Sequence, residues 1–364
     1  MNPGGELKVR LTMLNRRIAQ VEIASSRAAL PRALFAGRPA DDVVRLVPSL
    51  YSVCRSAQAA AAAGALDAAT GTPATKTTLQ QRGNVVRNEA AVEMLTRLLI
   101  DWPQAMDAEP DFAAVARVRR CITDELLDTC REVAQSHVFG VDADAWLAAM
   151  AADRLTEWLD RGDTLVARLL AELHTGSPDL GVCAIAALPE MTPAELAGEI
   201  LPRLDEDPSF ALHPDWRDAP AETGSLARVG AHPLVAAFVA AHGNSAAARY
   251  LARIVELALL LARGASPFAL PPSARQHMMP FGIGVGIVET ARGALLHVAR
   301  VDDGKVTDYT IVAPTEWNFH SRGALKQGLL GCSVTDARNA ARAARVLVQA
   351  LDPCVECEIE VADA

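Results

Sequence analysis

The middle of the chain constrains the fold most, because helical periodicity runs through it and only turn residues interrupt it. Alanine is abundant and aromatic residues make up only 4% of the chain, which favours closely packed helices over a β-sandwich. We therefore expect a predominantly helical protein. The segments with helical periodicity are 84–101, 111–135, 143–174, 192–205 and 233–263, the last with a break near Gly243 and Asn244.

Short β-like segments lie on both sides of this helical region. Residues 7–25 alternate loosely around Asn15, Arg16 and Arg17, which predicts a β-hairpin. The stretch from Ile283 to Pro314 is also β-like, and the sequence at 302–304, Asp-Asp-Gly, is a strong hairpin turn.

Two further helices follow from local signals. An alanine-rich helix is predicted at 55–70, and a C-terminal helix runs to Leu351 with Thr335 or Asp336 as its cap. The expected fold class is α+β, predominantly helical, in one domain. Its parts are a hairpin and the Cys54 helix (1–75), a helical region (76–280), and a β element with the C-terminal helix and a cysteine pair (281–364).

Bulk properties exclude several classes of function. A formal net charge of −9 argues against nucleic acid as a main partner. No apolar stretch of about 18 residues lacks charge, so no membrane insertion is expected. The first six residues show no secretory signal, and we expect a cytoplasmic protein. The seven irregularly spaced cysteines are then expected to be thiols rather than a disulfide framework.

Cysteine residues mark two candidate sites. Near the C-terminus, Pro353 ends a helix, and Cys354 and Cys357 then follow at a spacing that can present two thiolates to one metal. Alone, this pair is equally compatible with a metal site, a redox couple or coincidence. Cys54 lies just before the alanine-rich helix, where the helix dipole favours the thiolate. By itself it is more typical of a buried structural thiol.

A third candidate lies at the end of a predicted strand. Gly293 allows a close approach of the backbone to a bulky neighbour. Arg292 beside it is a fixed cation with several donors, suited to an anionic ligand. In isolation, a surface arginine at a strand end is the plainer interpretation.

Taken in order, these segments resemble the large subunit of nickel–iron hydrogenases. That family carries, from N- to C-terminus, a paired-cysteine motif, a Glu-x-Gly-Pro-Leu-Ala-Arg segment, a Glu-Ala-Pro-Arg-Gly segment followed by histidine, a Pro-Thr or Ser-Thr-Trp-Asn segment, and Asp-Pro-Cys-x-x-Cys. The matching segments here are the region around Cys54, Glu222–Arg228, Glu289–His297, Pro314–Asn318 and Asp352–Cys357.

Departures from the family pattern fall on the nickel side of its metal site. In the family, four cysteines hold nickel and iron, and the second cysteine of each pair bridges the two metals. Here the first N-terminal cysteine is replaced by Tyr51, whereas the two iron-binding positions, Cys54 and Cys357, are kept. A thiolate-rich site is what selects nickel, and here Tyr51 replaces one of the four thiolates. Bound nickel is therefore not expected. The motif histidine is replaced by Gln58.

The retained residues match the iron half of that site. The resemblance implies that Arg292 hydrogen-bonds one cyanide ligand of the iron and that Thr315, after Pro314, serves the second. It also implies that Leu295 contacts the carbon monoxide and that His297 lies close to the site. The other four cysteines are expected to be packing residues.

This pattern is similar to that of the hydrogenase accessory proteins known as HupK or HoxV. The resemblance implies a non-catalytic scaffold that holds the iron–dicyano–carbonyl unit, Fe(CN)2CO, through Cys54 and Cys357, with Cys354 as a relay thiolate. The implied partners are a hydrogenase large-subunit precursor and an iron-unit assembly complex of the HypC–HypD type. The cysteine pair near the chain end is expected to stay mobile. Two alternatives remain open: a hydrogenase or hydrogen sensor with an altered site, and a metal-free interaction protein.

Overall fold

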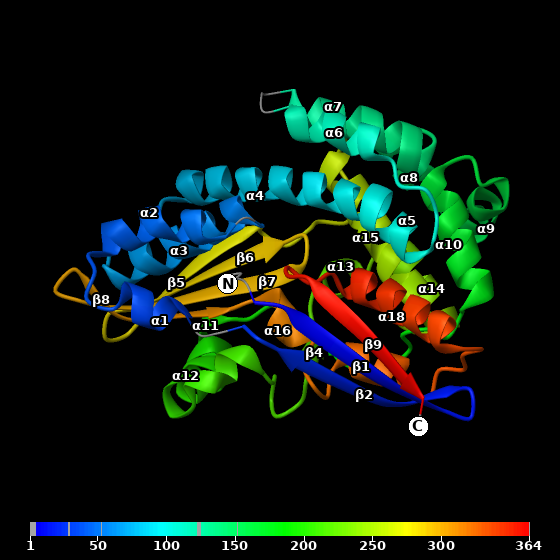
Figure 1. Cartoon of the computed structure of the whole chain (residues 1–364). Helices are drawn as coiled ribbons and strands as arrows, with labels where there is room; N and C mark the ends of the chain where they lie inside the picture. The colour runs from blue at the N-terminus through cyan, green and yellow to red at the C-terminus, as the bar shows by residue number, and fades with distance from the viewer. Residues whose placement is uncertain (1–4, 28–29, 52, 122–124, 151, 364) are drawn as a thin grey trace.

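The computed structural model describes residues 5–27, 30–51, 53–121, 125–150 and 152–363. Helices cover a four-stranded antiparallel sheet, and a separate three-stranded sheet lies beside the C-terminal helix (Figure 1). The predicted α+β, helix-dominated fold is confirmed. The first four residues, on which part of the signal-sequence expectation rested, lie outside the described residues.

The three-stranded sheet joins the two ends of the chain. Strands β1 (Leu7–Leu14) and β2 (Arg17–Ser25) form the predicted hairpin. Strand β9 (Cys357–Asp363) pairs in parallel with β1, so that Cys357 lies opposite Leu7. Strand β9 was not predicted. The expectation that the cysteine pair stays mobile is wrong for Cys357, because the ladder of hydrogen bonds to β1 holds this segment.

The four-stranded sheet supports the helix that follows Cys54. Its strands are β5 (Ala274–Met279), β6 (Ile283–Thr290), β7 (Gly293–Asp302) and β8 (Lys305–Val312) in sequential order. The β-like interpretation of 283–314 is confirmed, and β5 was missed.

Two glycines in β6 allow helix α3 (Arg55–Ala69) to lie directly on this sheet. A Cβ atom at Gly284 or Gly286 would come within 2.0 Å of a carbonyl oxygen of α3, at Ala65 and Ala61 respectively. This contact fixes where the helix starts, and therefore where Cys54 lies.

A central helical layer forms the other side of the structure. Helix α4 (Lys76–Thr96) continues through a π-helical turn, η1 (Arg97–Asp101), into α5 (Trp102–Ala105). Helix α15 (Ala246–Leu261) is buried along its whole length. It follows α14 (Pro233–His242), which confirms the break predicted near Gly243.

The remaining elements surround this framework. The predicted helices at 111–135 and 143–174 are each divided, whereas the one predicted at 192–205 is continuous from Pro193 to Glu206, with a π-helical turn inside it. Among the described residues, no helix is both long and apolar enough to cross a membrane. The other elements are α1 (Leu30–Phe35), α2 (Ala40–Leu50), α6 (Phe112–Arg120), α7 (Leu126–Ala134), η2 (Gln135–Phe139), α8 (Ala143–Ala149), α9 (Ala152–Arg161), α10 (Leu165–Gly176), β3 (Ala186–Ala187), α11 (Pro193–Glu195), η3 (Leu196–Ile200), α12 (Leu201–Glu206), η4 (Pro208–Leu212), β4 (Ala221–Glu222), α13 (Ser225–Val229), α16 (Pro314–Asn318), α17 (Ala324–Leu329) and α18 (Ala337–Leu351).

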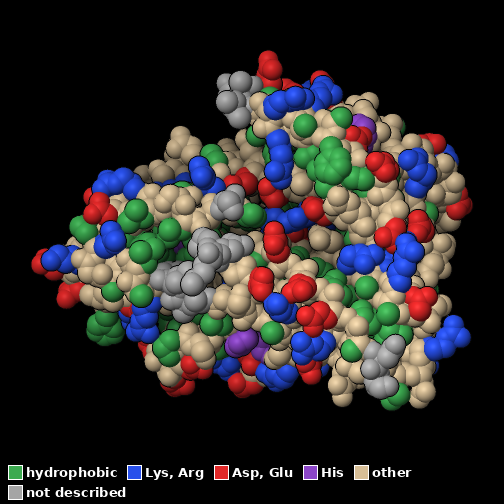
Figure 2. Space-filling view, in the orientation of Figure 1, with side chains coloured by type: hydrophobic (Ala, Val, Ile, Leu, Met, Phe, Trp, Pro, Cys, Tyr) green, Lys and Arg blue, Asp and Glu red, His purple; other side chains and the backbone are tan. Residues whose placement is uncertain are grey.

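Charged side chains of both signs are intermixed on the face shown in Figure 2. No single basic patch covers that face, in keeping with the net charge of −9. This face therefore lacks the electrostatic footprint of a nucleic-acid-binding surface.

Candidate metal-unit site

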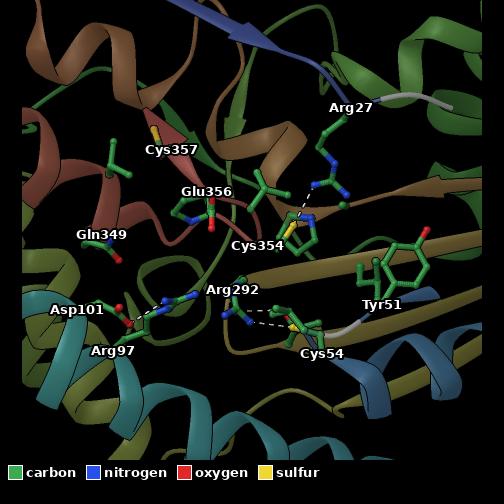
Figure 3. A pocket seen from close by; sticks show the side chains of 18 of the residues that line it. Arg27, Tyr51, Cys54, Arg97, Asp101, Arg292, Gln349, Cys354, Glu356 and Cys357 are labelled. Atoms are coloured by element: carbon green, nitrogen blue, oxygen red, sulfur yellow. Dashed lines mark hydrogen bonds and ion pairs between the residues drawn. The ribbon is translucent and has the colours of Figure 1, made fainter. Parts of the chain in front are cut away.

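One cavity of about 740 Å³ brings together nearly all the residues that the sequence singled out (Figure 3). Its walls come from the α2–α3 junction, the η1 turn, the β6–β7 turn, the start of α16 and the segment after α18. Of the residues expected to contact the iron unit directly, Thr315 is the one outside the lining, and it contacts Cys354 instead. The predicted residues in the lining are Cys54, Cys354, Cys357, Arg292, Leu295 and Pro314.

Cys54 is the N-cap residue of α3 and adopts a left-handed backbone conformation, with φ 56° and ψ 38°. The carboxylate of Glu89 on α4 accepts hydrogen bonds from the backbone N–H groups of Ser56 and Ala57, so it occupies the positive end of the helix. Burial raises the pKa of the Cys54 thiol to about 12, and Arg292 offsets only part of this rise. The expectation that the helix dipole favours the Cys54 thiolate is therefore wrong.

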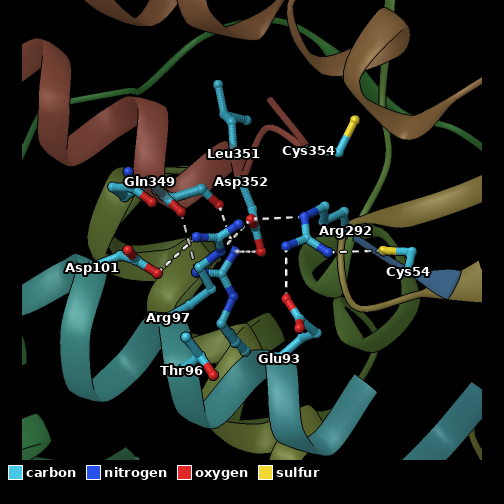
Figure 4. Close-up of polar contacts among 12 residues, drawn as sticks. Cys54, Glu93, Thr96, Arg97, Asp101, Arg292, Gln349, Leu351, Asp352 and Cys354 are labelled. Atoms are coloured by element: carbon cyan, nitrogen blue, oxygen red, sulfur yellow. Dashed lines mark hydrogen bonds and ion pairs between the residues drawn. The ribbon is translucent and has the colours of Figure 1, made fainter. Parts of the chain in front are cut away.

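Arg292 points its guanidinium at Cys54 (Figure 4). One terminal nitrogen lies 2.8 Å from Cys54 Sγ, and the other donates to Glu93 Oε2 at 2.9 Å. Its Nε lies 3.2 Å from Asp352 Oδ1. The side chain is only 1% exposed. These carboxylates hold the arginine in a single orientation, so it is a built feature of the cavity and not a surface residue at a strand end.

Asp352 is the centre of this charged group. It is the C-cap of α18 and contacts three arginines: Arg97 at 2.8 Å, Arg292 at 3.2 Å and Arg253 at 3.4 Å. Burial alone would raise its pKa, but the three guanidinium groups outweigh it and keep the pKa below its ordinary value. Asp352 therefore stays ionised and joins α18, α15 and the η1 turn to Arg292.

Cys354 is held by two donors. Arg27 Nη1 lies 2.9 Å from its Sγ, and Thr315 Oγ1 lies 3.0 Å from the same atom. The hydroxyl of Thr315 also accepts a hydrogen bond from the backbone N–H of Cys354 at 3.1 Å. Pro314 is the first residue of α16 and sets the position of Thr315.

Cys357 lies in the cavity wall as the first residue of β9. Within the described part of the chain, its Sγ makes one weak contact, to the carbonyl oxygen of Glu358 at 4.0 Å. Burial raises the pKa of this thiol to about 11. Cys357 is thus protonated near neutral pH and is less engaged than Cys354.

The positions that depart from the family pattern have structural roles here. Tyr51 lines the cavity. Gln58 is buried and its Oε1 lies 2.9 Å from His297 Nε2, while His297 Nδ1 lies 2.7 Å from the Tyr309 hydroxyl. Burial lowers the pKa of His297 to about 3, so the imidazole is neutral. His297 therefore organises the sheet behind α3 and is absent from the cavity lining.

Two other sequence interpretations have specific outcomes. The bulky neighbour expected beside Gly293 is part of the same chain, because a Cβ there would come 2.4 Å from Thr223 Cγ2. Arg228 pairs with Glu256 and Glu289 and is likewise absent from the lining of the cavity. The segment Glu222–Arg228 thus supports the Arg292 turn rather than the site itself.

Several important residues were missed by the sequence analysis. Four of these residues contact the site from segments that carry no motif: Arg27, Glu89, Glu93 and Arg97. The only available signal was the spacing of Glu89 and Glu93, which places two carboxylates on one face of a helix. Nothing local connected that face to Cys54 or Arg292.

The three cavity cysteines do not form a closed metal cage. Within the described part of the chain, no three Cys, His, Asp or Glu side chains are placed to hold one metal ion. No disulfide joins any of the seven cysteines, all of which are described.

The chain is similar in sequence to hydrogenase expression/formation proteins. The hydrogenase expression/formation protein HoxV of Cupriavidus necator is 30% identical over 94% of this chain and 93% of its own length. HupK of Bradyrhizobium diazoefficiens is also 30% identical, over 99% of this chain and 97% of its own length. The chain belongs to the HupK/HoxV family of hydrogenase expression/formation proteins. The family model described as nickel-dependent hydrogenase matches residues 235–360.

Solved structures of nickel–iron–selenium hydrogenases share the fold of this HupK/HoxV family member. The reduced, active enzyme from Desulfomicrobium baculatum aligns over 94% of this chain and 95% of its own, with a TM-score of 0.59 and 18% identity. The enzyme from Desulfovibrio vulgaris Hildenborough aligns over the same shares with a TM-score of 0.54. The predicted large-subunit-like fold is therefore confirmed.

Proposed function

We propose that this protein is a scaffold in hydrogenase maturation that holds an iron–dicyano–carbonyl unit and passes it to a hydrogenase large-subunit precursor. The observation that carries the proposal is Arg292, whose buried guanidinium is fixed by Glu93 and Asp352 and directed at Cys54 inside the cysteine-lined cavity. The membership of this protein in the HupK/HoxV family supports a role in hydrogenase formation.

The proposed cargo suits a site with few protein ligands. An iron that already carries two cyanides and a carbonyl needs only two more strong donors, which Cys54 and Cys357 supply. Both thiols have raised pKa values, so each must release its proton when iron binds. Ferrous iron and two cyanides sum to zero charge, and two thiolates then give the complex a charge of minus two. Arg292 neutralises part of that charge.

The other predicted contacts can orient the diatomic ligands. Leu295 is buried in the cavity wall and offers an apolar surface to the carbonyl. Arg292 can turn one donor from Cys54 to a cyanide nitrogen once the thiol becomes a metal ligand. Thr315 has one hydroxyl hydrogen, now directed at Cys354, so it can serve the second cyanide only when Cys354 changes partner.

Delivery requires a thiol that the cargo can reach without dissociating. We assign this role to Cys354, which lies close enough to Cys54 for their charges to interact and which Arg27 and Thr315 hold in place. The unit would arrive from an assembly complex of the HypC–HypD type and leave for the precursor.

A transfer assay tests the relay role. Loaded wild-type protein is mixed with the iron-free precursor, and the iron in each protein is measured after separation. With Cys354→Ala we expect near-normal loading but transfer slowed by about tenfold, the usual order for loss of a group beside a metal site. Equal losses of loading and transfer in this variant would contradict the relay assignment.

A further inference from the structure

We propose that Arg27 is a specificity-determining residue that makes the cavity reject bare divalent metal ions, nickel above all, in favour of a metal complex that already carries anionic ligands. The inference builds on the proposed scaffold function, but it concerns a different property of the site.

The Arg27 guanidinium is a permanent positive charge in contact with the Cys354 thiol. Arg27 follows β2, and its Nη1 lies 2.9 Å from Cys354 Sγ (Figure 3). Its Nε lies 3.1 Å from Glu316 Oε1. The side chain is 13% exposed and that of Glu316 is 6% exposed. The buried Glu316 side chain therefore holds the guanidinium against the thiol. Burial raises the pKa of the Glu316 carboxyl to about 7, and Arg27 offsets only part of this rise, so the carboxyl depends on Arg27 for its charge.

A guanidinium in this position opposes a second cation. Arginine does not lose its proton in proteins, so its charge is permanent. A divalent ion on Cys354 Sγ would have to displace Arg27 or lie beside its fixed positive charge in a partly buried site. Like charges at such distances repel strongly when water is largely excluded.

The same charges favour a complex with anionic ligands. Two thiols of the cavity, Cys54 and Cys354, each face a guanidinium, from Arg292 and Arg27 respectively. An iron unit with cyanides and thiolates carries net negative charge, so both arginines attract it. The same two arginines repel a bare dication. The cavity thus selects by charge rather than by counting thiolates.

Nickel, which the family model implies, does not fit the residues present. The resemblance assigns two nickel thiolates to the positions of Tyr51 and Cys354. Tyr51 has no thiol, and Arg27 already donates a hydrogen bond to Cys354 Sγ. This disagreement involves two separate residues, so the Tyr51 change alone does not account for it.

Titration with Ni²⁺ alone tests the inference, with calorimetry and metal analysis as readouts. The test variant is Arg27→Gln combined with Glu316→Gln, so that no buried carboxylate is left unpaired. We expect it to bind Ni²⁺ about tenfold more tightly than wild type, because the guanidinium that is removed lies against Cys354 Sγ, whereas the Glu316 carboxyl that is removed with it pairs with the guanidinium Nε. Arg27→Lys keeps the charge and should bind like wild type.

Arg345→Gln is the matched control, because Arg345 lines the same cavity but pairs with Asp107, and among the described residues no hydrogen bond joins it to a thiol. It should leave the affinity for Ni²⁺ unchanged. Equal affinity in wild type and the double variant overturns the inference, and so does an equal gain in the Arg345 control. Loading of wild type with the iron unit is measured separately, so its failure would count against the scaffold function without altering the nickel comparison.

Discussion

Replacing Cys54 with alanine is expected to abolish retention of the iron unit. The site offers two thiolates to the iron, and loss of one leaves a single protein bond, while Arg292 is left directed at an empty position. We expect affinity to fall by at least about 100-fold, the upper end for changes beside a metal. Cys357→Ala should have the same effect, because Cys357 is the second proposed ligand of the iron. Its thiol makes only a weak contact with the Glu358 carbonyl oxygen in the described part of the chain, so it is available to bind the metal.

The readout is the iron content and the infrared spectrum of each variant after purification without oxygen. Cys332→Ala is the matched control, because Cys332 is a half-buried cysteine outside the cavity whose Sγ contacts the Gly328 carbonyl oxygen. It should load like wild type. Retention of the unit by Cys54→Ala and Cys357→Ala at the control level would contradict the ligand assignment.

Gly286→Ala is expected to destabilise the fold by about 3 kcal/mol or more, because the new Cβ would overlap backbone that cannot relax cheaply. That Cβ would lie 2.0 Å from the Ala61 carbonyl oxygen and 2.8 Å from the Ala65 nitrogen. Either α3 lifts off the sheet or β6 distorts. Cys54 starts α3, so the change should also impair loading with iron.

Urea unfolding measures this effect. Gly83→Ala is the control, because its Cβ would lie 3.8 Å from the nearest atoms and Gly83 is inside helix α4. We expect that change to stabilise the protein by roughly 0.5–1 kcal/mol, because alanine restricts the unfolded chain. Similar unfolding midpoints for the two variants would show that α3 does not depend on the glycine contact.

Elements with local signals were predictable from the sequence. The hairpin turn at 302–304, the helix break near Gly243 and the Asp336 cap all appear where expected, because turn and cap chemistry acts within a few residues. Local signals also marked Cys54, Arg292, Cys354 and Cys357 as candidates, but only the resemblance, which spans most of the chain, joined them into one site.

Interactions between distant segments were not predictable. Strand β9 pairs with β1, with Cys357 opposite Leu7 across almost the whole chain. Arg27 likewise donates a hydrogen bond to Cys354, which is distant in the sequence. Asp352 forms ion pairs with arginines from three separate segments. No periodicity encodes such contacts, because each depends on the completed fold.

The ionisation of Cys54 shows why local rules failed at the site. Its place before α3 predicted a stabilised thiolate, but Glu89 already occupies the helix terminus and burial raises the thiol pKa to about 12. Tertiary packing therefore outweighs the dipole.

Infrared spectroscopy of wild-type protein, purified without oxygen from its native host, tests the central claim most directly. We expect cyanide and carbonyl stretching bands, with iron present and nickel absent in the same sample. Bands accompanied by equal nickel would point to a hydrogenase-type site, and a sample without bands and without iron would contradict the scaffold function.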